Sequence, residues 1–144
     1  MDKIKYSDDI NSDIYKDSLN IRETVFVKEQ HVDKNIEIDN DEAKCTYFTL
    51  YSNDKPAATA RFQVTDDNGI HIQRVAVLKE FRHQRLGSKL LDFIFKFAKE
   101  KHFDYVILGA QDHAQKFYQQ LGFKVVGDQY REAGILHHDM KMSL

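Results

Sequence analysis

The chain has 144 residues, of which 42% are hydrophobic and 31% are charged, so it can form one domain with a substantial core. Its net charge of −2 argues against a general nucleic-acid binder, and no apolar run approaches the ~20 residues of a membrane span. The single cysteine, Cys45, excludes internal disulfides and cysteine-rich zinc sites, so we expect no metal and a cytoplasmic location. Because no linker, repeat or signal peptide is visible, residues 1–144 are predicted to form a single domain.

The N-terminal segment changes from a strand pattern to a helix pattern. Polar and apolar residues alternate over Lys3–Tyr6, which predicts a short strand. Ser12 can cap a following helix, in which Ile14 and Ile21 fall on one face. The β-favouring run Val25–Val27 predicts the end of that helix.

The next segment, Glu29–Glu42, is acidic, with carboxylates outnumbering lysines. Charge runs of this kind are usually solvated, so we favour a solvated loop. The alternative is a wall that attracts a cationic substrate. The apolar residues Val32, Ile36 and Ile38 indicate that the segment packs against the rest of the protein.

Two β-like runs flank the turn residues Asp67–Gly69, after an earlier strand over Cys45–Tyr51. Asn-Gly between such runs is a strong hairpin signal. Ala57–Thr65 and Ile70–Val77 are therefore predicted to pair antiparallel.

The second strand of this hairpin has a predicted inner and outer face. Strict alternation would place Ile72, Arg74 and Ala76 on one face. His71 would lie on the opposite face with Val75, and we expect it at the surface.

The C-terminal half contains the clearest helix, Leu86–Lys101, whose apolar residues form one stripe. A buried strand over Phe103–Leu108 follows, and a helix between two strands predicts a parallel, right-handed unit in an α/β (α+β) sheet. The remaining predicted elements are a short helix over His113–Gln120, capped by Asp112 and ended by a left-handed Gly122, and two antiparallel strands over Phe123–Val126 and Ile135–Met142, separated by polar residues 127–134.

A basic loop, Lys79–Arg85, leads into the long helix. The first N–H groups of a helix are unpaired and favour anions, most often phosphate. The Walker pattern GxxxxGK[ST] and the dinucleotide pattern GxGxxG are both absent, since Gly87 is the only glycine here. The loop alone therefore predicts only an anion site.

Two segments together resemble motifs A and B of the GNAT family of N-acetyltransferases. RVAVLKEFRHQRLGSKLL, residues 74–91, resembles motif A, with its Gln/Arg-x-x-Gly-x-Gly/Ala pattern falling on Arg82–Gly87. AQDHAQKFYQQLGF, residues 110–123, resembles motif B. The early VFVKEQ, the AQxH and the late GILH are similar to an ElaA/YjcF-like subgroup. One position departs from the pattern, because Arg85 stands where motif A has its first glycine.

This resemblance implies a mixed, mostly antiparallel sheet of about six or seven strands with about four helices. Its central parallel pair would splay to bind acetyl-CoA, the expected co-substrate. The pantetheine would pair with the first of these strands, and the pyrophosphate would sit on the basic loop. The implied acetyl-CoA-binding residues are Val75, Ala76, Val77, Arg82, His83, Gln84, Arg85, Leu86, Gly87, Ser88, Gln111, Ala114, Phe117 and Tyr118.

The resemblance also implies an acetyl-CoA-dependent N-acetyltransferase, in which an amine attacks the thioester directly in a ternary complex. Tyr118 matches the tyrosine that assists the leaving thiolate. The general base stays open among Glu29, Asp39, His71 and His137, with Glu29 and Asp39 also candidates for binding a cationic acceptor.

Arg61 and Arg74 could bind a carboxylate of the acceptor, or could equally pair with acidic neighbours. The expected partner is a small-molecule or peptide amine, without nucleic acid or membrane, and a homodimer is left open as an alternative to a monomer. The alternatives are a catalytically idle module that senses acetyl-CoA and, less favoured, a phosphate or nucleic-acid interaction domain that uses the patch Lys79–Lys89.

Overall fold

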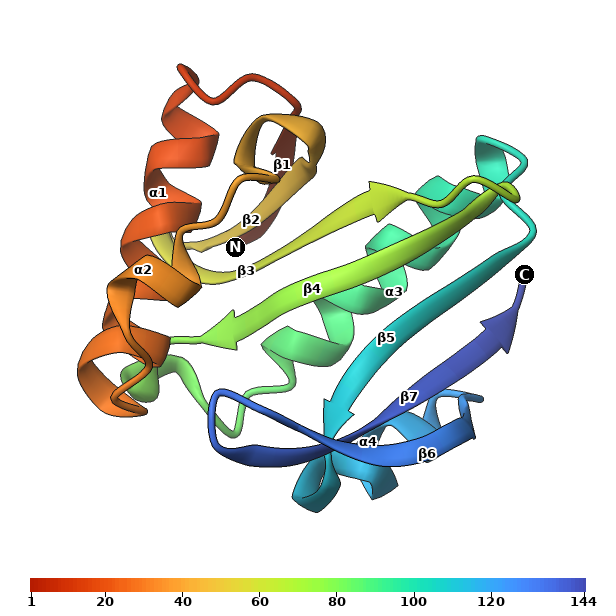
Figure 1. Ribbon diagram of the computed structural model, residues 1–144. Coiled ribbons are helices and arrows are strands. Elements are labelled where there is room, and N and C mark those ends of the chain that lie inside the picture. The colour runs from red at the N-terminus through yellow and green to blue at the C-terminus, as the bar shows by residue number, and fades with distance from the viewer.

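A computed structural model, which describes residues 1–144, has one seven-stranded sheet in the order β1-β2-β3-β4-β5-β7-β6 (Figure 1). Only β4 and β5 pair in parallel, and every other neighbouring pair is antiparallel. The predicted mixed sheet with a central parallel pair is therefore confirmed. The strands are β1 (Asp2–Ser7), β2 (Thr46–Ser52), β3 (Lys55–Val64), β4 (Gly69–Val77), β5 (Tyr105–Gln111), β6 (Lys124–Glu132) and β7 (Ile135–Ser143).

Helices cover both faces of this sheet. The helix α3, which runs behind the sheet in Figure 1, buries its apolar stripe in the main core, whereas α1 packs on the opposite face around Ala76. None of the helices combines the length and the apolar character that crossing a membrane requires. The α-helices are α1 (Asp13–Arg22), α2 (Lys34–Glu37), α3 (Leu86–Glu100) and α4 (Gln115–Gln120).

Several local predictions hold, and others need correction at the element ends. The Ser12 hydroxyl caps α1 by accepting a hydrogen bond from Tyr15 N at 3.1 Å. Helical winding does not stop at Val25–Val27, because a π-helix continues it to Glu29. Gly122 has the predicted positive φ, 107°.

The C-terminal hairpin is longer than the sequence indicates. The strand β6 continues to Glu132 through part of the polar segment predicted as irregular. Asp112 does not cap α4. It starts a 3₁₀ turn, and its carboxylate binds His138 Nδ1 at 2.7 Å.

A β-bulge in β4 overturns the predicted alternation of its side chains. The register with β3 shifts between Thr59 and Arg61, and Arg74 opposite this shift has φ of 59°. A bulge adds one residue to one strand, so the residues beyond it change face. Ile72 and Val75 consequently face α3, whereas Ala76 faces α1.

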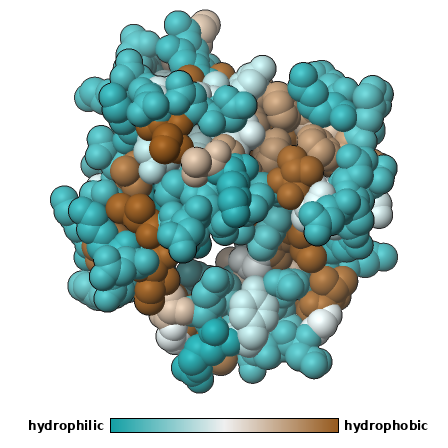
Figure 2. Space-filling view, turned by 45° about the horizontal axis from the view of Figure 1, so that its top comes forward, coloured by the Kyte–Doolittle hydropathy of each residue, from teal (hydrophilic) through white to brown (hydrophobic).

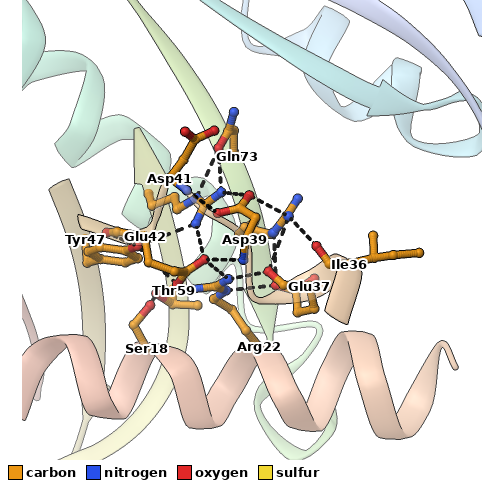
Figure 3. A network of polar contacts seen from close by, with 12 residues as sticks. Ser18, Arg22, Ile36, Glu37, Asp39, Asp41, Glu42, Tyr47, Thr59 and Gln73 are labelled. Atoms are coloured by element: carbon orange, nitrogen blue, oxygen red, sulfur yellow. Dashed lines mark hydrogen bonds and ion pairs between the residues drawn. The ribbon is translucent and has the colours of Figure 1, made fainter. Parts of the chain in front are cut away.

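The acidic segment is not a solvated loop. Three of its carboxylates, those of Glu37, Asp39 and Glu42, turn inward and form ion pairs with arginines from α1, β3 and β4 (Figure 3). Two of these arginines are almost completely buried, with exposures of 0% and 1%. The members of this network are Arg22, Arg61, Arg74, Glu37, Asp39 and Glu42.

Glu42 is the centre of the network. Its two carboxylate oxygens each accept a 2.7 Å ion pair, one from Arg22 and one from Arg61, and Tyr15 donates a further hydrogen bond. Burial alone would raise the pKa of Glu42, but the hydrogen bonds and charge of Arg22 and the charge of Arg61 hold it far below its usual value of 4.5. The charges therefore compensate one another inside the fold, which is the condition for burying ions at all.

We expect Glu42→Gln to lower the free energy of unfolding by ~3 kcal/mol near pH 7, because it leaves two buried guanidinium groups short of one anion. Urea unfolding measures this difference. Because the folded-state pKa of Glu42 is depressed, its contribution is present above its usual value of 4.5 and is lost as the pH falls below that value. The gap between wild type and variant should therefore shrink in acid.

Asp41→Asn is the matched control, because Asp41 has a single 3.5 Å ion pair with an exposed lysine. Such a pair contributes less than ~1 kcal/mol. An equal loss in both variants would contradict the central place of Glu42.

Candidate functional site

The site begins where the two parallel strands separate. β4 and β5 pair only from Gly69 to Ile72 and from Tyr105 to Leu108, so the edge of β4 from Gln73 to Val77 has no partner on this side. A cavity of about 340 Å³ opens at this divergence. Its mouth is a hollow near the centre of the space-filling view, bordered mainly by hydrophilic side chains (Figure 2). The sheet thus offers unpaired backbone next to an open cavity.

The hairpin of β6 and β7 forms one wall of this cavity. The Tyr130 hydroxyl donates a 2.7 Å hydrogen bond to Asp139 Oδ1 and lies over Gly109 of β5. A Cβ atom on Gly109 would clash with that hydroxyl, so any other residue would require the Tyr130 side chain to shift. The missing side chain in β5 therefore makes room for the Tyr130 hydroxyl of the hairpin wall.

His137 lies on this wall with one ring nitrogen available. Its Nδ1 is 2.8 Å from the carbonyl oxygen of Ile135, which can only accept, so Nδ1 carries the proton. The neutral ring then has a free lone pair on Nε2, which is 3.9 Å from the Glu132 carboxylate. The Tyr130 ring stacks on the imidazole at 5.6 Å. This arrangement presents a hydrogen-bond acceptor, Nε2, next to the Glu132 carboxylate.

His71 also lines the cavity, so its expected surface position is wrong. It lies on β4 ahead of the bulge and is half-buried. Burial lowers the pKa of its ring. His71 is therefore neutral at pH 7 and offers hydrogen bonds rather than charge.

Tyr118 reaches the cavity from α4. Its ring packs edge-on against Phe117 and Phe123, with centroids 5.0 and 5.9 Å away. Burial raises the pKa of its phenol to about 12. The hydroxyl consequently keeps its proton at physiological pH and can donate it in a hydrogen bond.

The basic loop is held by Arg82. This side chain donates to the Val77 carbonyl at 3.0 Å and forms a bidentate pair with Glu29 at 2.6 and 2.8 Å. His83 and Arg85 adopt left-handed conformations, with φ of 65° and 61°, and their side chains are exposed. Arg85 is the residue before α3 and caps it with no side-chain bond. The loop thus presents uncapped N–H groups and a free guanidinium to solvent.

The structure brings together only part of the predicted site. Arg74, Val75, Gln111, Ala114, Tyr118 and His137 line the cavity, and the loop residues lie beyond the free end of β4. Glu29, Asp39 and Arg61 lie outside the lining. Glu29 is occupied by Arg82, and Arg61 binds Asp39 and Glu42. Of the two roles expected for Arg61, its side chain therefore pairs with acidic neighbours and is not free to bind a carboxylate of the acceptor.

Sequence reasoning missed the residues that long-range pairing delivers to the cavity. Tyr130 and Glu132 come from the segment predicted as irregular, and Gln73 and Glu37 had no recognised role. No local pattern marks them. The one available signal was the alternation of polar and apolar residues along β6, the strand that pairs with β7, and this alternation is weak.

We expect Arg85→Gly to raise the free energy of unfolding by ~1 kcal/mol, because a left-handed backbone is strained for residues with a Cβ. Arg85→Ala is the matched control, since it removes the guanidinium and keeps the strain. Urea unfolding of both variants separates the two effects. A gain in the alanine variant as large as in the glycine variant would show that side-chain charge, and not φ, is responsible.

Comparisons with known proteins agree with this geometry. The family model described as an acetyltransferase (GNAT) domain matches residues 6–144. The uncharacterised N-acetyltransferase YjcF of Bacillus subtilis is 34% identical over 131 residues, which cover 90% of this chain and 93% of YjcF.

Solved structures have the same fold. ElaA of Escherichia coli is 30% identical, with a TM-score of 0.86 and 99% of both chains covered. An aminoglycoside 6'-N-acetyltransferase, solved with coenzyme A, has a TM-score of 0.72 over 98% of this chain and 96% of its own. At 14% identity it shows the fold alone.

Proposed function

Because the chain belongs to the GNAT acetyltransferase family, we propose that it transfers an acetyl group from acetyl-CoA to an amine. The observation that carries this proposal is the divergence of β4 and β5 beside a cavity with a free imidazole lone pair. The reaction is direct attack of the amine on the thioester carbon, with both substrates bound together. The C–S bond breaks, a C–N bond forms, and coenzyme A leaves as a thiol.

The unpaired edge of β4 supports the binding of acetyl-CoA. Peptide-like amides of pantetheine would extend the sheet at Val75–Val77, since strand addition satisfies exposed backbone groups. A backbone N–H near Val75 or Ala76 would polarise the thioester oxygen. The pyrophosphate would lie on the N–H groups of His83–Ser88 at the start of α3.

Gly87 supports this placement of the pyrophosphate. A Cβ atom there would meet Val77 Cγ2 at 3.6 Å, an ordinary contact, so the fold itself does not require glycine. Glycine also weakens a helix by ~0.5–1 kcal/mol. A residue that costs stability without a packing reason is explained by a ligand that approaches the backbone closely.

His137 is our choice for the general base. An alkylamine of pKa about 10.4 is almost entirely protonated at pH 7 and must lose a proton before attack. The Nε2 lone pair of His137 would accept this proton. Glu132 would attract the ammonium group and would stabilise the imidazolium that forms. Glu29 and Asp39 are less suited, because arginines already hold their carboxylates.

Tyr118 assists the leaving thiolate through a hydrogen bond. A thiol has a pKa of about 8.5, so a phenol with a pKa of about 12 is too weak an acid to protonate the thiolate fully. Its retained proton can still stabilise the charge that develops on sulfur in a dry site.

A screen of amines that follows free thiol released from acetyl-CoA tests this function. Release that depends on the amine supports an acetyltransferase. Tight acetyl-CoA binding without release for any amine would favour the idle sensing module instead. Failure to bind acetyl-CoA would contradict both.

We expect Gly87→Ala to weaken acetyl-CoA binding by ~10-fold or more, because the methyl group obstructs the pyrophosphate. The melting temperature should stay the same or rise, since alanine favours a helix over glycine. Calorimetric titration and thermal unfolding give the two values. Unchanged affinity would place the pyrophosphate elsewhere.

Tyr118→Phe should lower kcat by ~10²-fold, because it removes the hydrogen bond to the leaving sulfur. Its effect on acetyl-CoA affinity should stay within about twofold, since the ring and its packing remain. Steady-state kinetics with calorimetry separates the two quantities. An unchanged kcat would remove Tyr118 from the chemistry.

A further inference from the structure

We propose that His71 donates a hydrogen bond to the acceptor and so selects amines that carry a neutral carbonyl oxygen next to the reacting nitrogen. An amino-acid amide or a peptide N-terminus has this chemistry. The inference rests on the proposed function for its cavity, and it adds the substrate class. Its structural basis is a chain of hydrogen bonds from the buried ion network to the imidazole.

The first link fixes the orientation of the Gln73 amide. Arg61 donates to Gln73 Oε1 from Nε at 3.0 Å and from Nη2 at 2.9 Å. Arg61 itself cannot turn, because its exposure is 1% and ion pairs of 2.7 Å bind it to Asp39 and Glu42. The carbonyl side of Gln73 therefore points to Arg61, and its NH₂ group points away.

The second link fixes the tautomer of His71. Gln73 Nε2 lies 3.3 Å from His71 Nδ1, and an amide nitrogen can only donate. Nδ1 is consequently the acceptor in this bond. The single proton of the neutral ring must then be on Nε2.

The Nε2–H group is open to the cavity. His71 Nε2 has no hydrogen-bond partner in the protein. Arg74 Nε is the only side-chain polar atom that is both buried and without a hydrogen bond, so His71 Nε2 cannot be buried and must be accessible. His71 lines the cavity, and the Nδ1 edge of its ring is occupied by Gln73. Asp139 and Glu132 would favour a charged ring, but burial and the arginines Arg61 and Arg74 oppose it.

The two histidines of the cavity thus have opposite roles. His137 carries its proton on Nδ1 and presents an acceptor, whereas His71 carries its proton on Nε2 and presents a donor. An acceptor substrate complements this pair if an N–H group and an oxygen lie on the same short molecule. The amine would face His137, and the oxygen would face His71.

The charges of the cavity favour a neutral oxygen over a carboxylate. Arg74 is the one cationic side chain in the lining other than histidine, and it already faces Glu37 Oε2 at 3.0 Å and Asp39 Oδ2 at 3.2 Å. Glu132 adds an unpaired negative charge beside His137. A carboxylate would find no free cation here, whereas an amide carbonyl needs only the Nε2–H donor.

Long-range ¹H–¹⁵N correlation spectra test the tautomer on the protein alone. Wild type at pH 7.5 should show His71 protonated on Nε2, with His71→Phe identifying the signals. Gln73→Glu should move the proton to Nδ1, because a carboxylate accepts where the amide donated. An Nδ1–H tautomer in wild type would overturn the inference.

Kinetics with matched amines test selection. Glycinamide and isobutylamine have nearly the same shape, but only glycinamide has a carbonyl oxygen. We expect the ratio of kcat/KM for glycinamide to kcat/KM for isobutylamine to be ~10-fold higher in wild type than in His71→Phe, which corresponds to one hydrogen bond. Comparing the ratio between proteins cancels the different reactivities of the two amines. Gln73→Glu should lose the preference too, and thermal unfolding checks that each variant is folded. An equal ratio in wild type and His71→Phe would overturn the inference.

A binding experiment separates this inference from the proposed function. Glycinamide added to the protein with coenzyme A should shift the His71 Nε2–H resonance, and isobutylamine should not. Absence of thiol release with every amine would contradict the acetyltransferase, while this shift would still support the donor role of His71. Equal shifts with both amines would overturn the inference even where acetyl transfer is observed.

Discussion

Mutual neutralisation of three arginines and three carboxylates holds the N-terminal half of this protein together. Ions buried singly would destabilise the fold, but here the carboxylates of the acidic segment lie against Arg22, Arg61 and Arg74. The network joins α1, α2, β3 and β4, elements far apart in the sequence (Figure 3). Through Arg61 and Gln73 it also reaches the imidazole of His71. The same contacts therefore support the fold and orient a side chain of the cavity.

The second constraint is the irregularity of β4. Its bulge at Arg74 changes the face of the following residues, and its loss of pairing with β5 after Ile72 opens the sheet. A regular strand would have closed the cavity with hydrogen bonds to its neighbour. The features that look like defects of the sheet are thus the ones that create unpaired backbone and space.

The sequence predicted the secondary-structure elements better than it predicted the tertiary contacts between them. The hairpin at Asn68, the helix α3 and the glycine at 122 follow from local physics, and the mixed sheet with its central parallel pair follows from the family resemblance. The bulge was not predictable, because alternation patterns assume a regular strand. The burial of Glu37 and Glu42 was not predictable either, since it depends on arginines contributed by α1, β3 and β4, which are distant in the sequence. The cavity residues from β6 were missed as well, because the pairing of β6 with β7 brings them to the cavity and no local pattern marks them.

The contact between Tyr130 and Gly109 has a consequence for the diversification of this architecture. The acetyl-CoA side of the proposed site is built from β4 and the start of α3, whereas the hairpin of β6 and β7, anchored over one glycine, forms one wall of the remaining cavity beside Gln30 and Glu37. The tip of that hairpin can change in length or composition while the anchor keeps its register. The same acetyl-CoA-binding part of the fold could in this way serve different amine acceptors, with changes in a short hairpin tip altering which acceptors fit.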